Sequence, residues 1–98
     1  MTTSVLTKKI QNTLISSNVE FAALFGSRAK GTARVDSDYD FLVKFSPSHN
    51  YTIFDLLDLR NKLSRNLRKT VDVVTVNGLN PKMRSEVLKT MKVVYENK

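Results

Sequence analysis

The stretch "FGSRAKGTARVDSDYD", Phe25 to Asp40, joins two apolar segments through a glycine–serine pair and a group of aspartates. It contains two of the three glycines of the chain, three basic residues and three aspartates. A glycine that directly follows an apolar run predicts a tight turn at the end of a buried strand. The aspartates lead into the next apolar run. The stretch therefore predicts a strand, a turn and a second strand, with charged side chains gathered between them.

Two short segments on either side of this turn have the pattern of strands. "VEFAALF", Val19 to Phe25, is mostly apolar and is stopped by glycine, which predicts a buried strand. In "DYDFLVKF", Asp38 to Phe45, alternation places Asp38 and Asp40 on the same face as Lys44. Lys44 lies either near the aspartates or at the far end of their strand. The opposite face is expected to pack inward and consists of Tyr39, Phe41, Val43 and Phe45.

Helical periodicity accounts for two longer segments. An apolar residue at every fourth position predicts a first helix from about Ser4 to Ser16. A second long helix is expected to begin near Thr52, because Thr52 and Asp55 have the spacing of a capping box. The apolar stripe of this second helix consists of Leu56, Leu59, Leu63 and Leu67.

The remaining segments predict a strand, a helix and a short final strand. "VDVVTV", Val71 to Val76, is rich in β-branched residues. Asn80 as N-cap and Pro81 at the first helical position predict a helix that runs to about Thr90. "KVVYE" then predicts the final strand. The residues of this last helix that we expect to face the core are Met83, Val87, Leu88 and Met91.

This order of elements predicts an α/β or α+β fold with a small mixed β-sheet flanked by helices. A length of 98 residues without repeats or a linker predicts a single domain over residues 1–98. The chain has no cysteine and no apolar run of membrane-spanning length, so we expect a cytoplasmic protein without disulfides, thiolate metal sites or membrane contact.

The chain carries a formal net charge of +7, which suits a nucleic acid, an anionic nucleotide or an acidic partner surface. Several of these charges lie in "RNKLSRNLRK", Arg60 to Lys69. This segment is either a solvated helix face or part of an RNA-binding surface. The interleaved aromatic and basic residues of RNA-binding sheets are absent from the sequence. The solvated face is therefore favoured, and direct binding of nucleic acid is disfavoured.

The aspartates predict a metal site. Asp38 and Asp40 project from one face of a strand, an unfavourable arrangement unless a cation joins the two carboxylates. A ligand set made only of oxygen indicates a hard cation, Mg²⁺ in the first place and Mn²⁺ as the alternative. Asp72 lies inside an apolar strand and is the candidate third carboxylate. Three such carboxylates can hold two metal ions that clamp the oxygens of a phosphoryl-transfer reaction. Asp36 is read as a loop residue.

The glycine–serine pair predicts a phosphate site beside this metal site. Gly26 permits a close approach of backbone to ligand, and Ser27 begins a single helical turn, "SRAK", whose free N–H groups suit an anion. Arg28 and Lys30 supply positive charge nearby. Taken singly, these features also describe an ordinary turn and a solvated acidic loop. In combination they predict a site for a nucleoside triphosphate and its magnesium.

With these residues the chain resembles the DNA polymerase β-type nucleotidyltransferase superfamily. The shared pattern is a Gly-Ser pair, an Asp-X-Asp motif and a third aspartate on a later strand. It stands here as Gly26-Ser27, Asp38-Tyr39-Asp40 and Asp72. The longer string "GSRAKGTARVDSDYDFLV" is most similar to the minimal nucleotidyltransferases, or MNT proteins.

The resemblance implies a role for each motif residue. Asp38 and Asp40 would bind metal, and Asp72 would be the third metal ligand and the base for an acceptor hydroxyl. Gly26 and Ser27 would contact the triphosphate. The fold implied is the palm-like core of the superfamily.

The resemblance to the MNT proteins also implies a function. The chain would transfer AMP from ATP to a tyrosine hydroxyl of a ribonuclease toxin with a HEPN domain, inactivate the toxin and so act as its antitoxin. The alternative is a non-catalytic antitoxin that neutralises its toxin by binding. A third hypothesis is an RNA-binding module that uses the segment Arg60 to Lys69.

Overall fold

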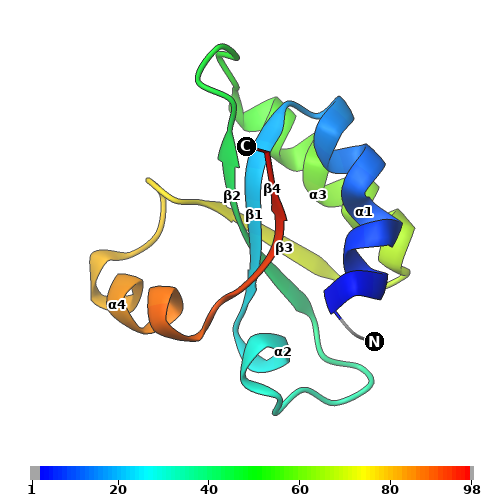
Figure 1. The fold of residues 1–98 in the computed structure, drawn as a ribbon, viewed down its shortest axis with the longest axis vertical. Helices are drawn as coiled ribbons and strands as arrows, with labels where there is room; N and C mark the ends of the chain where they lie inside the picture. The colour runs from blue at the N-terminus through cyan, green and yellow to red at the C-terminus, as the bar shows by residue number, and fades with distance from the viewer. Residues whose placement is uncertain (1–2, 98) are drawn as a thin grey trace.

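The computed structural model describes residues 3–97 as four helices and four strands in alternation (Figure 1). The elements are α1 (Thr3–Ser16), β1 (Val19–Phe25), α2 (Ser27–Lys30), β2 (Tyr39–Phe45), α3 (Ile53–Leu67), β3 (Val71–Thr75), α4 (Pro81–Thr90) and β4 (Lys92–Glu96). This order confirms the elements expected from the sequence, the short final strand included.

The four strands form one mixed sheet in the order β3-β2-β1-β4. β1 runs antiparallel to both β2 and β4, whereas β2 and β3 are parallel. A parallel pair needs a long crossover connection, and α3 provides it. In the β2–β3 register Tyr39 lies opposite Val71 and Asp40 opposite Asp72. The predicted small mixed sheet is therefore confirmed, and its register brings two aspartates onto neighbouring strands.

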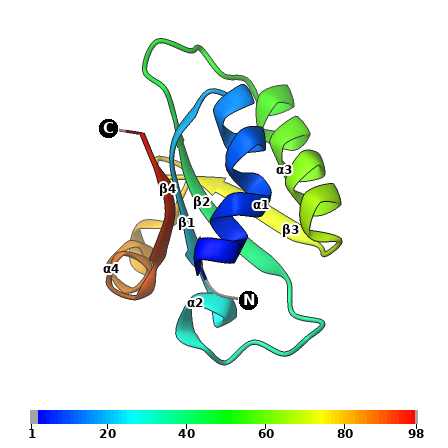
Figure 2. The same ribbon diagram turned by 45° about the vertical axis from the view of Figure 1, so that its right-hand side comes forward.

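The helices cover the two faces of the sheet unequally. Figure 2 shows α1 and α3 side by side on one face, α4 on the other face and α2 at the end of β1. The main core lies under α1 and α3, where Ile10, Leu59 and Phe41 are completely buried. A smaller core of Phe25, Leu42, Leu79 and Val87 lies on the α4 face.

The helix ends follow the predicted capping signals. The Thr52 N–H donates to Asp55 Oδ2 over 2.8 Å, and both hydrogen bonds of the capping box are present. At α4 the Asn80 side chain accepts from the Lys82 N–H over 3.0 Å, and Pro81 occupies the first turn. The boundaries of α3 and α4 are thus set by short-range hydrogen bonds that the sequence encodes locally.

The expectation that Met83 and Leu88 face the core is wrong. Met83 is 48% exposed and Leu88 is 51% exposed, whereas Val87 is buried and Met91 packs against the smaller core. Helical positions 100° apart point in different directions, so a helix that contacts the sheet through Val87 turns Leu88 outward. α4 contacts the sheet through few side chains, so part of the sheet face on which it lies stays uncovered.

Within residues 3–97 no helix is both long enough and apolar enough to cross a membrane.

Candidate active site

The turn after β1 has a backbone conformation that only glycine adopts readily. Gly26 has φ 74° and ψ −153°. A Cβ atom at this position would lie 2.5 Å from Asp40 Oδ2, which is closer than any real contact. Glycine thus allows the turn to pass directly beneath the Asp40 carboxylate. The group that Gly26 approaches in the structure is an aspartate of the neighbouring strand, and the predicted approach of its backbone to a ligand stays a prediction.

The single turn of α2 follows directly. The Gly26 carbonyl accepts the N–H groups of both Ala29 and Lys30 over 3.1 Å, while those of Ser27 and Arg28 have no partner within the turn. Gly31 ends the turn with φ 76°. Free N–H groups at the start of such a turn suit an anion. The phosphate-binding role of Gly26 and Ser27 stays a prediction, and the free N–H groups of this turn support it.

Three aspartates lie at the beginning of β2 and β3. Asp40 is half-buried, and its register partners are Asp72 on β3 and Phe25 on β1. Asp38 directly precedes β2 and is exposed, as is Asp72. β3 forms an edge of the sheet, so the Asp72 carboxylate is open to a second molecule. Since paired strands lie about 4.8 Å apart, the register places the Asp40 and Asp72 backbones side by side.

The electrostatics of this group favour a cation. Burial raises the pKa of Asp40 above its usual value, and the negative charges of Asp72 and Asp38 raise it further. Each cause disfavours the ionised carboxylate, and a bound cation would reverse the repulsion. Oxygen donors without histidine or cysteine fit Mg²⁺ or Mn²⁺.

The side chains do not, however, form a finished metal centre. Among residues 3–97 no three carboxylate or imidazole groups converge in the positions that they occupy in the structure. The metal-ligand roles of Asp38, Asp40 and Asp72 therefore stay a prediction. It is supported by the strand register and by the raised pKa of Asp40.

A pocket of about 280 Å³ opens between the glycine turn and α4. Gly26, Lys30 and Asp40 line it on one side, and Met83 and Glu86 of α4 on the other. Lys30 Nζ lies 2.7 Å from Glu86 Oε1. The hydrogen bond and positive charge of Lys30 lower the pKa of Glu86 below its usual value. The pocket thus joins the phosphate-type turn, one aspartate and a basic side chain, Lys30, for which a nucleotide contact was predicted.

The guanidinium of Arg28 serves the loop between α2 and β2. Its Nη2 donates to the carbonyl of Ser37 over 2.8 Å and to that of Val35 over 3.3 Å. The guanidinium carbon also lies 4.0 Å from the centre of the Tyr39 ring. Arg28 therefore positions the segment that leads into Asp38. Sequence reasoning assigned Arg28 to the nucleotide and missed this role, although the aromatic residue between the two aspartates was a usable signal.

Lys44 and His49 lie away from the aspartates, and Tyr39 points to the opposite face of β2 from them. Lys44 is at the far end of β2, where its Nζ is 3.4 Å from Glu20 Oε1, and this decides between the two alternatives for it. His49 lies in the turn after β2, with its Nε2 3.8 Å from Asp55 Oδ2. Tyr39 is buried, as its place on the inward face predicted.

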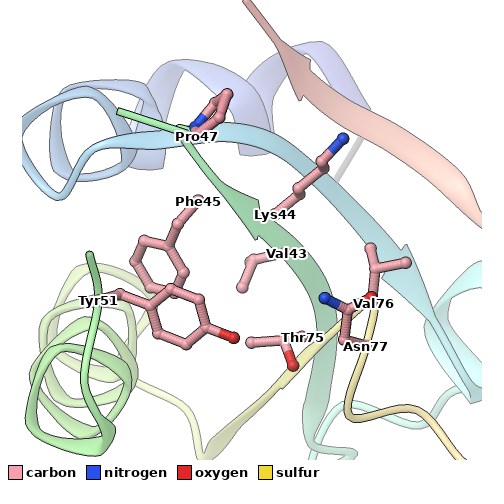
Figure 3. A pocket seen from close by; sticks show the side chains of 8 residues that line it. All are labelled: Val43, Lys44, Phe45, Pro47, Tyr51, Thr75, Val76 and Asn77. Atoms are coloured by element: carbon pink, nitrogen blue, oxygen red, sulfur yellow. The ribbon is translucent and has the colours of Figure 1, made fainter. Parts of the chain in front are cut away.

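A second pocket, of about 260 Å³, lies at the opposite ends of β2 and β3 (Figure 3). The ring of Tyr51 stacks on Phe45 with 4.4 Å between centroids, and the Tyr51 hydroxyl points toward Thr75 in the figure. None of the predicted site residues lines this pocket. The chemistry-bearing groups are therefore concentrated at one end of the sheet.

A mixed sheet that brings a Gly-Ser turn beneath an Asp-X-Asp strand, with a third aspartate on the parallel neighbour, defines a nucleotidyltransferase core. The comparison with protein families agrees with this class. The family described as polymerase beta, nucleotidyltransferase, matches residues 8–98, and the chain belongs to this family.

Individual relatives point to the minimal members of the family. A protein of Methanocaldococcus jannaschii named "Putative protein adenylyltransferase MJ0435" is 33% identical over 88 residues, which are 90% of this chain and 92% of that protein. A solved structure described as a "putative minimal nucleotidyltransferase" is 32% identical, with a TM-score of 0.76 over 94% of this chain and 95% of that chain.

A more distant structure shares the fold. It is the complex of a tri-AMPylated Shewanella oneidensis HEPN toxin with its MNT antitoxin. The matched chain is 19% identical, with a TM-score of 0.72 over 98% of this chain and 74% of that chain.

Proposed function

We propose that this protein is a protein adenylyltransferase that transfers AMP from ATP to a tyrosine hydroxyl of a HEPN-domain toxin and thereby acts as an antitoxin. One observation carries the proposal: Gly26 passes beneath Asp40, and Asp40 lies in register with Asp72. A phosphate-type turn and the carboxylates thus meet at one end of one sheet. The relative named as an adenylyltransferase gives the chemistry, and its match spans nearly its whole length.

In this proposal residues 1–98 form one nucleotidyltransferase domain that works in the cytoplasm. The N–H groups of Ser27 and Arg28 and the hydroxyl of Ser27 hold the triphosphate, and Lys30 turns from Glu86 toward it. Asp38, Asp40 and Asp72 would hold two Mg²⁺ ions, with Mn²⁺ as the alternative. Such ions supply charge neutralisation to the phosphates and to the carboxylates themselves.

The placement of Asp72 on an edge strand supports the proposed transfer step. The acceptor oxygen attacks the α-phosphorus of ATP, the bond from that phosphorus to the β-phosphate oxygen breaks, and pyrophosphate leaves. The Asp72 carboxylate accepts the proton of the acceptor hydroxyl. Because Asp72 is exposed, a protein can present a tyrosine to it without displacing any other element.

The partner is proposed from the structural neighbours. In the Shewanella complex an MNT antitoxin is bound to a HEPN toxin that carries three AMP units. We propose the same pairing here, as a heteromeric complex whose toxin supplies the acceptor tyrosine.

The test is intact mass spectrometry of the cognate HEPN protein after incubation with this protein, ATP and Mg²⁺. The expected result is a mass gain of one or more AMP units, lost in the Asp38→Asn/Asp40→Asn double variant and kept in the control Asp58→Asn. Asp58 is an exposed aspartate of α3 whose partner is Lys62. No gain from a complex that forms and binds ATP, with the toxin still neutralised, would instead favour the antitoxin that acts by binding.

A further inference from the structure

A basic hollow lies at the end of α3, next to the starts of β2 and β3, and shares no residue with the pocket at Lys30. Its volume is about 460 Å³, and its lining consists of Asp36, Ser64, Arg65, Arg68, Lys69 and Thr70. These residues come from the loop before β2, the end of α3 and the turn into β3. Figure 2 shows that loop and that turn on the same side of the molecule. The hollow contains the second half of the basic segment Arg60 to Lys69, and the proposed function assigns no role to this segment.

The three cations of the hollow have no acidic partner. Residues 3–97 contain four ion pairs within 4.0 Å, and Arg65, Arg68 and Lys69 take part in none of them. The one carboxylate of the lining, Asp36, makes no ion pair with them. The negative end of the α3 dipole is equivalent to about half a charge, which is too little to balance three cations. The hollow therefore favours an anionic ligand.

The hollow borders the strand starts that carry the carboxylates. Thr70 comes two residues before Asp72, and Asp36 two residues before Asp38. The Tyr39 N–H donates to the Thr70 carbonyl over 3.0 Å, which fixes the two segments to each other. Two residues of extended chain span about 7 Å, so the Thr70 edge of the hollow lies within about 7 Å of the Asp72 backbone along the chain.

We propose that Arg65, Arg68 and Lys69 bind the phosphodiester of an AMP unit that is already attached to the acceptor. This subsite rests on the proposed function and assigns residues of this chain that hold the product of one transfer during the next. A ribose hydroxyl of the attached AMP is then held near Asp72. It attacks the α-phosphorus of a second ATP, the bond to the β-phosphate oxygen breaks, pyrophosphate leaves, and Asp72 accepts the hydroxyl proton.

The lining favours this ligand over an RNA strand. Single-stranded RNA is usually bound through aromatic side chains on which bases stack, and no aromatic residue lines the hollow. Guanidinium groups, in contrast, suit the oxygens of a single phosphodiester. Arg65 and Arg68 are both exposed, so a ligand can reach them without a change in fold.

The first arm of the test measures binding without catalysis. The probe is fluorescent diadenylate with a 5′-phosphate, titrated against the whole chain. We expect Arg65→Gln/Arg68→Gln to weaken binding about tenfold, as the loss of charge-assisted contacts predicts. Two controls accompany it. Arg60→Gln/Lys8→Gln removes the same charge outside the hollow and should change binding less than threefold, and Arg65→Lys/Arg68→Lys should recover part of the loss.

The second arm follows the mass of the HEPN acceptor with time. The Arg65→Gln/Arg68→Gln variant should add the first AMP at a rate within about twofold of the wild-type rate. It should add the second AMP at least about tenfold more slowly than the wild-type protein does. A melting curve for each variant establishes that it is folded.

The outcomes separate the subsite from the proposed function. If the first AMP is never added, the proposed function fails, whatever the binding arm gives. The subsite is overturned if the variant slows the second addition no more than the first. It is also overturned if the wild-type protein adds only one AMP. The subsite is also overturned if the variant and the charge-matched control bind diadenylate equally well. Tighter binding of oligouridylate RNA than of diadenylate would overturn it too.

Discussion

The two faces of β2 differ in what their side chains do. Tyr39, Phe41, Val43 and Phe45 face α1 and α3 and are buried in the main core. The other face carries Asp40 at its start, directly after Asp38, and Lys44 at its end, and α4 covers it only in part. Because side chains alternate along a strand, seven residues serve both faces at once. Side chains that stabilise the fold thus point to one face of β2 and the candidate site residues to the other. Substitutions on the two faces should therefore have different consequences.

The largest loss of stability is expected on the helix face. Phe41→Ala should lower the free energy of unfolding by about 3–5 kcal/mol, because it empties a completely buried position. Urea unfolding measures the change. Lys44→Ala, on the other face of the same strand, is the matched control and should cost less than about 1 kcal/mol, since it removes only a surface ion pair. Equal losses would break the comparison between the faces.

Gly26→Ala is expected to combine a moderate loss of stability with loss of nucleotide binding. The backbone conformation alone costs about 1–3 kcal/mol for a residue with a Cβ, and the added atom also displaces the Asp40 carboxylate. Gly31→Ala is the control, because it too has positive φ but has no atom within 4 Å of an added Cβ. Calorimetric titration with ATP should show binding to the Gly31 variant and none to the Gly26 variant. Equal affinities would mean that the glycine turn does not hold the nucleotide.

A smaller effect is expected from pH. The raised pKa of Asp40 means that the folded chain holds this proton more tightly than the unfolded chain. Stability is therefore lost as pH rises from the usual aspartate range through the pKa of the folded state. Without divalent metal, Asp40→Asn should raise stability at pH 7 by less than about 1 kcal/mol, since the group is partly exposed, and by nothing near pH 3. Melting curves of both proteins between pH 3 and pH 7 measure the difference in stability, and a difference of equal size at both ends of this range would contradict the prediction.

The smallest effect is expected at the ion pair across the pocket. Glu86→Gln leaves Lys30 without its partner, so ATP should bind about two- to threefold more tightly at low salt. High salt should cancel the gain, because exposed charges are screened. Glu20→Gln frees Lys44 in the same way at the far end of β2 and should leave ATP affinity unchanged. A gain of equal size in both variants would show that net charge alone, and no contact made by Lys30, sets the affinity.

Local signals explain why so much of the fold was readable from the sequence. The two-residue alternation of β2, the capping box at Thr52 and the Asn80-Pro81 start of α4 each act within a few residues. The sequence also placed Asp38 and Asp40 on one face and named Asp72 as their partner. The register opposite Asp40 agrees with that pairing. What was misread depends on contacts between distant segments. The exposure of Met83 and Leu88 follows from how α4 lies on the sheet, which the α4 sequence does not encode.

Arg28 shows the same division between local and distant information. Its guanidinium binds carbonyl groups of the following loop and covers Tyr39. From sequence alone, a basic residue beside a Gly-Ser pair indicates a phosphate contact, because the loop's path is unknown. The hollow at Arg65 and Arg68 was equally hidden. The sequence favoured a solvated helix face for the segment Arg60 to Lys69. The pocket there forms only because α3 lies against the loop before β2.

The strand order has a consequence for how the protein is made. β1 lies inside the sheet between β2 and β4, yet β4 is far along the chain from it. On the ribosome, β1 can pair with β2 early, but one of its edges must wait until β4 has emerged. Thr7 in α1 also donates a hydrogen bond to the Val94 carbonyl of β4, so the first helix gains a partner at the same late moment. A nascent chain that stalls before β4 exposes the unpaired edge of β1, and we expect proteases to cleave such an incomplete chain.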